Sequence, residues 1–274
     1  MADPLLIQDL YIYPIKSLAG IRLTAAKVAE RGFELDRRWM LVDESGTFLT
    51  QRKFPLMAQF KVEIAPDGLI VYPDFAPKNK INIPFEAEID AQVAVRIWDD
   101  QMVAQLVGTQ IDEWFSELLN KPVRLVKMPL TTHREISPKY AENGEAVSFA
   151  DAMPYLIIGQ ESLNDINARL DSPVPMDRFR PNIVFSGGSA FAEDSWKHIR
   201  IGEVDFRVTK PCARCVMITI DQATSNQGKE PLKTLSTYRK VGNKVLFGQN
   251  MMALKAGEVK VGDTVQSLSE KANQ

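Results

Sequence analysis

The chain is poor in cysteine and histidine, with two of each among 274 residues. Two cysteines cannot build a disulfide framework, so we expect a protein of the reducing cytoplasm. No apolar run approaches the roughly 18 residues that span a bilayer, and residues 1–6 lack the basic start of a signal peptide, so we expect no membrane partner. The formal net charge of −2, without any run of basic residues, argues against a nucleic-acid partner.

The chain does contain enough apolar sequence for a large core. Hydrophobic residues make up 45% and charged residues 25%, values typical of a soluble protein, and the length suggests two domains. Short apolar runs separated by turn residues are typical of β-strands. The expected strands cover residues 10–13, 39–42, 60–64, 69–72, 92–97, 182–185, 204–208, 216–220 and 260–261. We therefore expect a mainly β fold with some helices (α+β), built as barrels or sandwiches.

Two segments show helical periodicity instead. Apolar residues recur at helical spacing from Ile111 to Leu119, with Thr109 as the expected N-cap and Pro122 as the stop. A second helix is expected over residues 162–170. Helices are thus expected to be a minor part of the fold.

Both cysteines lie in one short segment, KPCARC, at residues 210–215. A thiol is reactive as its thiolate, and the flanking Lys210 and Arg214 favour that charged form in both Cys212 and Cys215. The residues that follow, 216–220, are mostly β-branched and predict a strand. That strand would place the thiols at the entrance to a rigid element.

The residue types leave three interpretations of the cysteine pair open. It could be a redox dithiol, although such a pair usually opens a helix within a βαβ unit. It could be half of a zinc site, but His133 and His198 are not spaced to supply the remaining ligands. It could also be two small buried apolar side chains, because free cysteine is often buried.

Basic residues and hydroxyl groups gather in three further segments, which are residues 13–17 (YPIKS), 35–39 (LDRRW) and 177–182 (DRFRPN). If these segments converged on one cleft, they would suit a phosphate or another oxyanion. Taken singly, each cation would be an ordinary solvated surface charge. The sequence does not show which of the two arrangements holds.

Short motifs along nearly the whole chain resemble the MOSC family, the domains related to the C-terminal region of molybdenum-cofactor sulfurase. The motifs are YPIKS at 13–17, DRRW at 36–39, FRPN at 179–182, EDSW at 193–196, KPCARC at 210–215, EPLKTL at 230–235, FGQN at 247–250 and VGD at 261–263. The resemblance implies an N-terminal MOSC β-barrel domain over residues 1–120 and a MOSC domain, also a β-barrel, over residues 121–268.

In these motifs the chain resembles the amidoxime-reducing components and their bacterial counterparts, which carry a molybdenum cofactor (Mo-molybdopterin). The resemblance implies that Cys215 is the catalytic residue and the protein ligand of the metal, with Cys212 as a supporting neighbour. A soft thiolate suits a metal that the pterin already holds through two sulfurs. The implied cofactor-binding residues are Lys16, Ser17, Arg37, Asp151, Arg180, Asn182, Ala213, Arg214 and Asn250.

The implied activity is that of an oxidoreductase that reduces small N-hydroxylated compounds. A [2Fe–2S] cluster needs four ligands and the chain has two cysteines, so we expect electrons from a separate ferredoxin or flavoprotein. An alternative follows from the sulfurase, whose separate domain uses pyridoxal phosphate. In that alternative the protein carries the cofactor, or carries sulfur as a persulfide on Cys215. Metal analysis of the purified protein separates the two hypotheses.

Overall fold

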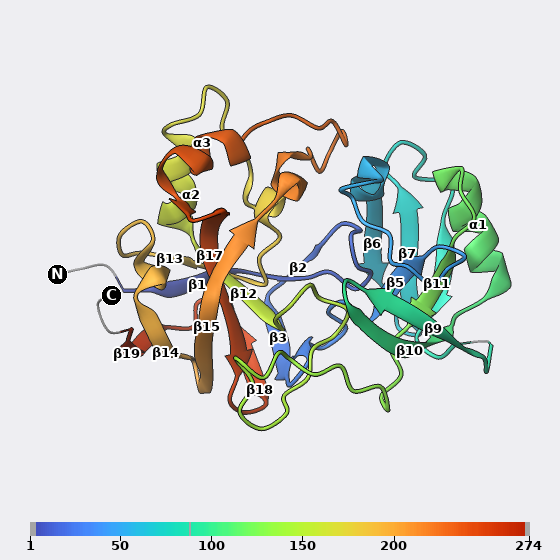
Figure 1. Cartoon of the computed structure of the whole chain (residues 1–274), viewed down its shortest axis with the longest axis horizontal. Coiled ribbons are helices and arrows are strands. Elements are labelled where there is room, and N and C mark those ends of the chain that lie inside the picture. The colour runs from blue at the N-terminus through green and yellow to red at the C-terminus, as the bar shows by residue number, and fades with distance from the viewer. Residues whose placement is uncertain (1–3, 88, 272–274) are drawn as a thin grey trace.

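The computed structural model describes residues 4–87 and 89–271, which form two β-rich lobes joined across a narrow waist (Figure 1). Strands dominate both lobes, and the described residues include three α-helices, so the expected fold class is confirmed. The helices are α1 (Thr109–Leu119), α2 (Gln160–Asn167) and α3 (Leu232–Tyr238). No helix within the described ranges is long and apolar enough to cross a bilayer.

The lobe on the right of Figure 1 contains two small antiparallel sheets with α1 packed beside them. One sheet has the order β5-β11-β10-β9 and the other the order β6-β7-β8. Their strands are β5 (Trp39–Val42), β6 (Phe60–Ile64), β7 (Gly68–Pro73), β8 (Ile81–Pro84), β9 (Gln92–Ile97), β10 (Asp100–Leu106) and β11 (Arg124–Lys127). Trp39, Phe60 and Phe115 are buried at the centre of this lobe, where apolar burial stabilises the packing.

The other lobe is built on a large sheet with the order β19-β14-β15-β17-β12-β13-β1-β2, and β16 pairs with β17 at its side. Its strands are β1 (Leu6–Ile12), β2 (Ile21–Leu23), β12 (Tyr155–Gly159), β13 (Ile183–Ser186), β14 (Trp196–Ile201), β15 (Val204–Arg214), β16 (Lys240–Val241), β17 (Lys244–Ala253) and β19 (Val265–Glu270). A smaller sheet contains β3 (Ala25–Ala29), β4 (Gly32–Phe33) and β18 (Gly257–Lys260).

The large sheet is covered on both faces, which explains why β12 is buried along its whole length. Side chains alternate across a strand, so Ile157 packs into one apolar cluster and Ile158 into the other. The helices α2 and α3 cover the second cluster through Leu163, Ile166 and Leu235. The strands β12 and β13 are parallel and are connected through α2, the arrangement that buries a sheet on both sides.

The chain passes back and forth between the lobes near its start. The strands β1 and β3 pair with β13 and β18 of the lobe formed by the second half of the chain, while Ile15 and Leu18 pack into the other lobe. The passing segments bind each other, because Lys16 N donates to Trp39 O at 2.8 Å and Arg37 N donates to Tyr13 O at 2.9 Å. Lys16 and Arg37 are therefore held at the junction of the lobes.

Several expected elements match the structure and others differ from it. The strands expected at residues 39–42, 60–64 and 92–97 coincide with β5, β6 and β9. Thr109 is wrong as the N-cap of the first helix, because Gly108 occupies that position and Thr109 is the first helical residue. The second helix begins at Gln160 and ends at Asn167, earlier than expected.

The strand expected at residues 216–220 is wrong. Residues Val216–Thr219 form a 3₁₀ helix, η4, in which Ile218 N donates to Cys215 O at 3.3 Å. The Thr219 hydroxyl also donates back to Val216 O at 2.7 Å, a local bond that competes with strand pairing. Ile218 and Ile220 are buried, so packing decides the conformation against the strand preference of β-branched residues.

Candidate functional site

A cleft of about 480 Å³ lies at the junction of the two lobes. Its wall combines the crossing segments near the start of the chain with the ends of β15 and β17. The structure brings together in this cleft the ten residues that the family resemblance implies as metal ligand or cofactor-binding residues, namely Lys16, Ser17, Arg37, Asp151, Arg180, Asn182, Ala213, Arg214, Cys215 and Asn250. The basic segments therefore converge, which the sequence alone left open.

The cleft is strongly cationic. Among the described residues its lining includes a single carboxylate, Asp151, against the basic residues Lys16, Arg37, Arg52, Arg178, Arg180, Lys210, Arg214 and Lys244. A concave surface with one sign of charge concentrates ligands of the opposite sign. The lining is therefore suited to an anion with several acceptor oxygens.

Lys16 is almost fully buried at the base of the cleft. Its Nζ donates to Asp151 Oδ1 at 2.6 Å and to the carbonyl oxygen of Phe149 at 2.7 Å. Burial lowers the pKa of Lys16 to about 8, although the charge of Asp151 acts in the opposite direction. Burial alone would raise the pKa of Asp151, but the cations of Lys16 and Arg52 hold it well below its usual range.

Arg37 and Arg180 differ in how their charges are balanced. Arg37 donates to Asp36 Oδ2 at 2.6 Å and to Asn182 Oδ1 at 3.2 Å. Arg180 lies over the Tyr13 ring at 4.2 Å and forms no ion pair with a carboxylate among the described residues. Burial lowers the pKa of Arg180 to about 10. Arg180 is thus a buried cation without a carboxylate in direct contact, which is costly unless an anion binds there.

Arg214 also has unused hydrogen-bonding capacity. Its Nε donates to Phe247 O at 2.8 Å and its Nη1 donates to Phe179 O at 2.8 Å. Its Nη2 is buried and has no hydrogen-bond partner within the part of the chain that the structure describes. Buried polar groups are normally satisfied, so an unpaired guanidinium nitrogen beside a cleft indicates a missing acceptor.

Cys215 is exposed at the end of β15, immediately before η4, and not at the entrance to a strand as expected. Cys212 lies within β15, is half-buried and packs against the apolar cluster beneath the cleft. The two thiols are therefore unequal in their surroundings. Only the Cys215 thiol has a charged side chain as a hydrogen-bond donor among the described residues, because Arg52 Nε lies 3.2 Å from its Sγ.

Arg52 is the main residue of the cleft that the sequence did not indicate. Its Nη2 donates to Asp151 Oδ2 at 2.9 Å while its Nε faces the thiol. Burial would lower the pKa of Arg52, and the nearby charges of Asp151 and Cys215 raise it above its ordinary value. Arg52 follows β5 in a turn without any motif, so no signal separates it from the other cations of the chain.

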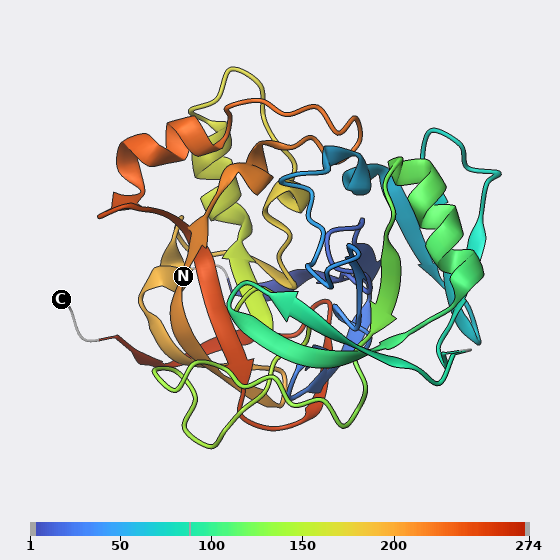
Figure 2. The same cartoon turned by 45° about the vertical axis from the view of Figure 1, so that its right-hand side comes forward.

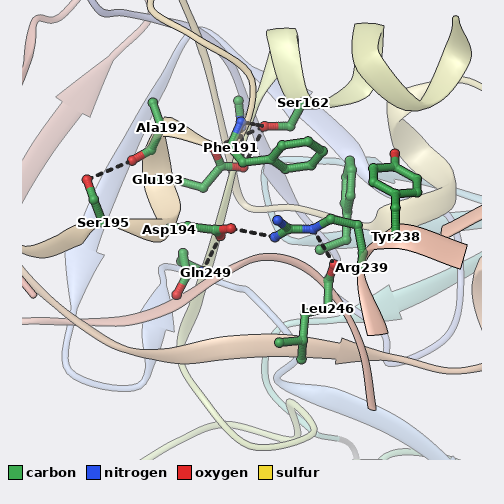
Figure 3. Close-up of polar contacts among 12 residues, drawn as sticks. Ser162, Phe191, Ala192, Glu193, Asp194, Ser195, Tyr238, Arg239, Leu246 and Gln249 are labelled. Carbon is green, nitrogen blue, oxygen red and sulfur yellow. Dashed lines mark hydrogen bonds and ion pairs between the residues drawn. The ribbon is translucent and has the colours of Figure 1, made fainter. Parts of the chain in front are cut away.

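A partly buried polar network contacts β17 through Gln249 (Figure 3). Gln249 on β17 donates to Asp194 Oδ1 at 2.6 Å, and Arg239 binds the second oxygen of the same carboxylate. Gln249 lies opposite Pro211 on β15, and Asn250 lies opposite Lys210. The EDSW and FGQN motifs therefore contact each other through Asp194 and Gln249, which ties β17 to the turn at residues 192–194.

The two histidines lie apart from the cleft lining. His133 Nε2 is 3.0 Å from Gly144 O, and His198 Nδ1 is 3.1 Å from Ser269 Oγ. Within residues 4–87 and 89–271 no group of three or more His, Cys, Asp or Glu side chains is arranged to hold a metal ion. A metal in this cleft would therefore need ligands from a cofactor in addition to Cys215.

Anion binding in the cleft should depend on pH through Lys16. Because the pKa of Lys16 is about 8, the side chain loses its charge above that pH, and a bound dianion favours the charged form. We expect the affinity for sulfate, which does not titrate in this range, to fall up to about tenfold per pH unit above pH 8. Calorimetric titration at pH 7 and 9 measures this. Lys16→Arg should show a flat profile, and a flat wild-type profile would contradict the assignment.

Family models and curated relatives match the chain over most of its length. The model described as the MOSC N-terminal beta barrel domain matches residues 5–122, and the model described as the MOSC domain matches residues 144–266. A mitochondrial amidoxime-reducing component 1 from Danio rerio is 32% identical over 279 residues, which cover 96% of this chain and 85% of the relative. The Homo sapiens protein of the same name is 30% identical, with 96% and 83% covered.

A molybdenum cofactor sulfurase from Oryza sativa subsp. japonica is also similar, with 31% identity over 261 residues. These residues cover 88% of this chain but only 32% of the sulfurase. The chain thus spans about a third of that longer relative.

Proposed function

Because the chain belongs to the MOSC family, with a MOSC N-terminal β-barrel domain followed by a MOSC domain, we propose that its cationic cleft binds a molybdenum cofactor. The proposal rests on the observation that arginines without a carboxylate partner lie in the same cleft as an exposed thiol. Arg180 and Arg214 line the same cleft as Cys215, and neither has a carboxylate partner among the described residues.

The residues of the cleft suit such a cofactor in two respects: cationic side chains match its negative phosphate, and a thiolate matches its metal. Lys16, Arg180 and Arg214 would bind the dianionic phosphate and the polar edge of the pterin, with Asn182 and Asn250 as neutral partners. Cys215 would supply a soft thiolate to the metal. Arg52 would keep the thiol in place through the contact at 3.2 Å, and Asp151 would hold Arg52 in turn.

We further propose that the protein reduces N-hydroxylated compounds, such as amidoximes and hydroxylamines, to the parent nitrogen compound and water. When bound, the cofactor supplies the two-electron removal of oxygen from the substrate. The reaction consumes two electrons and two protons, and the electrons come from a separate ferredoxin or flavoprotein. The names of the amidoxime-reducing relatives support this substrate class. We place the reaction in the cytosol, where both free thiols stay reduced.

The second candidate is a carrier of the cofactor or of sulfur. The exposure of Cys215 favours it, since a persulfide on this thiol would be accessible to a partner. The similarity to a molybdenum cofactor sulfurase supports the same hypothesis. In this case the cleft would bind the cofactor without turning over a substrate.

Metal and pterin analysis after expression in a host that makes the cofactor separates the two candidates. The reductase should contain about one molybdenum and one pterin per chain, and it should reduce benzamidoxime with reduced methyl viologen as the electron donor. Persulfide on Cys215 without molybdenum would instead support the sulfur carrier. A molybdenum-loaded protein that reduces neither benzamidoxime nor hydroxylamine would overturn the proposed reductase.

A further inference from the structure

The turn between β9 and β10 carries an exposed tryptophan in a strained position. Ile97 pairs with Asp100, so Trp98 and Asp99 form a two-residue hairpin loop. Trp98 has a φ of 54°, in the left-handed region that a large side chain rarely adopts and where such loops favour glycine. Its side chain is nevertheless 47% exposed. Strain that is retained at an exposed position commonly marks a functional role.

Trp98 is not part of the cleft lining, but it contacts Arg52, which is. The β9–β10 hairpin reaches from its own lobe toward the other one, as Figure 1 shows and as Figure 2 shows from a turned view. The guanidinium of Arg52 lies over the Trp98 ring at 4.6 Å, and the Nε of the same guanidinium is 3.2 Å from Cys215 Sγ. One guanidinium therefore spans the gap between the indole ring and the thiol.

A second aromatic ring, that of Phe48, packs against Trp98. Phe48 meets Trp98 edge to face with ring centroids 5.0 Å apart, and Lys16 Nζ lies 5.3 Å from the Phe48 centroid. Phe48 is half-buried against the apolar cluster of its lobe, so it cannot move freely. The indole is thus held against Arg52 on one side while much of its surface stays in contact with solvent.

We propose that Trp98 is the platform on which the planar part of the substrate binds, so that the protein prefers aromatic N-hydroxylated substrates over small ones. This inference rests on the proposed reductase function. An exposed indole presents a large rigid face, and stacking of a planar group on it contributes to binding without any charge. A cationic or amidine-like group on the substrate gains further from the same face. Hydroxylamine has no planar group and makes no such contact.

The test compares two substrates in variants at position 98. Trp98→Gly removes the ring and relieves the turn, because glycine suits the position, so the variant should fold. We expect it to raise KM for benzamidoxime about tenfold, with kcat and the KM for hydroxylamine within about twofold of the wild type. Trp98→Phe should retain most of the preference. Phe75→Ala is the matched control, because it removes an aromatic side chain that is 52% exposed and packs on Phe60 instead of Arg52.

A binding measurement separates this inference from the proposed activity. Benzamidine, the expected product, should quench the tryptophan fluorescence of the loaded wild-type protein, and Trp98→Phe should lose the quenching. Quenching without any reduction would leave the platform standing and overturn the reductase. Reduction with equal losses for both substrates in Trp98→Gly would show that the ring only braces Arg52, and this would overturn the platform. Unchanged kinetics in that variant would overturn it as well.

Discussion

Replacing Cys215 with alanine should lower the reduction of benzamidoxime by more than about a hundredfold. Removal of a group that only hydrogen-bonds to a metal ligand lowers metal affinity or activity about 10- to 100-fold. Removal of the ligand itself should lower the activity further. The side chain is exposed and is not part of an apolar cluster, so the fold should be unaffected. Molybdenum content and steady-state rates, measured on the same preparation, check the prediction.

Cys212 provides the matched comparison, because it is the second thiol of the same segment. It is half-buried and packs with the cluster under the cleft, so Cys212→Ala should lower stability, by about 1 kcal/mol, more than it lowers activity. Equal losses of activity in the two variants would mean that the thiols act as a pair. That result, or an active Cys215→Ala protein, would contradict the assignment of a single thiolate ligand.

Replacing Arg180 with methionine should have opposite effects on the cofactor-free and the loaded protein. The buried guanidinium is only 7% exposed, and burial lowers its pKa to about 10, so the empty cleft is destabilised by its charge. Methionine keeps much of the packing on Tyr13 without the charge, so the cofactor-free variant should be about 1–2 kcal/mol more stable. Loss of a buried charge contact should weaken cofactor retention by about 30-fold or more.

Urea unfolding of the cofactor-free proteins and molybdenum content after gel filtration measure the two effects separately. Arg200→Met is the control, because Arg200 is an exposed arginine on β14 that pairs with Asp205 and does not line the cleft. Arg200→Met should change neither the free energy of unfolding nor the molybdenum content by much. If Arg180→Met retains the cofactor as well as the wild type does, Arg180 does not bind the anion.

The fold could be predicted where local pattern and final packing agree. The strand over residues 39–42 matches β5 because four consecutive buried residues fill the space between two apolar clusters. The segment after Cys215 shows the opposite case. Its residues have strand preference, but the burial of Ile218 and Ile220 favours a tight turn, and only the assembled lobe determines that.

The residues that form the site could be predicted, but which of their charges have an ion-pair partner could not. The motifs identify Arg37 and Arg180 equally, yet Asp36 forms an ion pair with the first and no described carboxylate forms one with the second. Arg52 carries no motif and is recognised only because the chain brings it within 3.2 Å of the thiol. Such pairings join residues far apart in sequence, so residue types and spacing cannot reveal them.

The interleaving of the chain has a consequence for the biosynthesis of the protein. The strands β1 and β3 leave the ribosome well before their partners β13 and β18, which follow some 170 to 230 positions later. The crossings that hold Lys16 and Arg37 are framed by these strands, and β17, which carries Asn250, is also synthesised late. The cleft therefore forms only after the residues up to β18 have been translated, so the proposed cofactor would be inserted after that point.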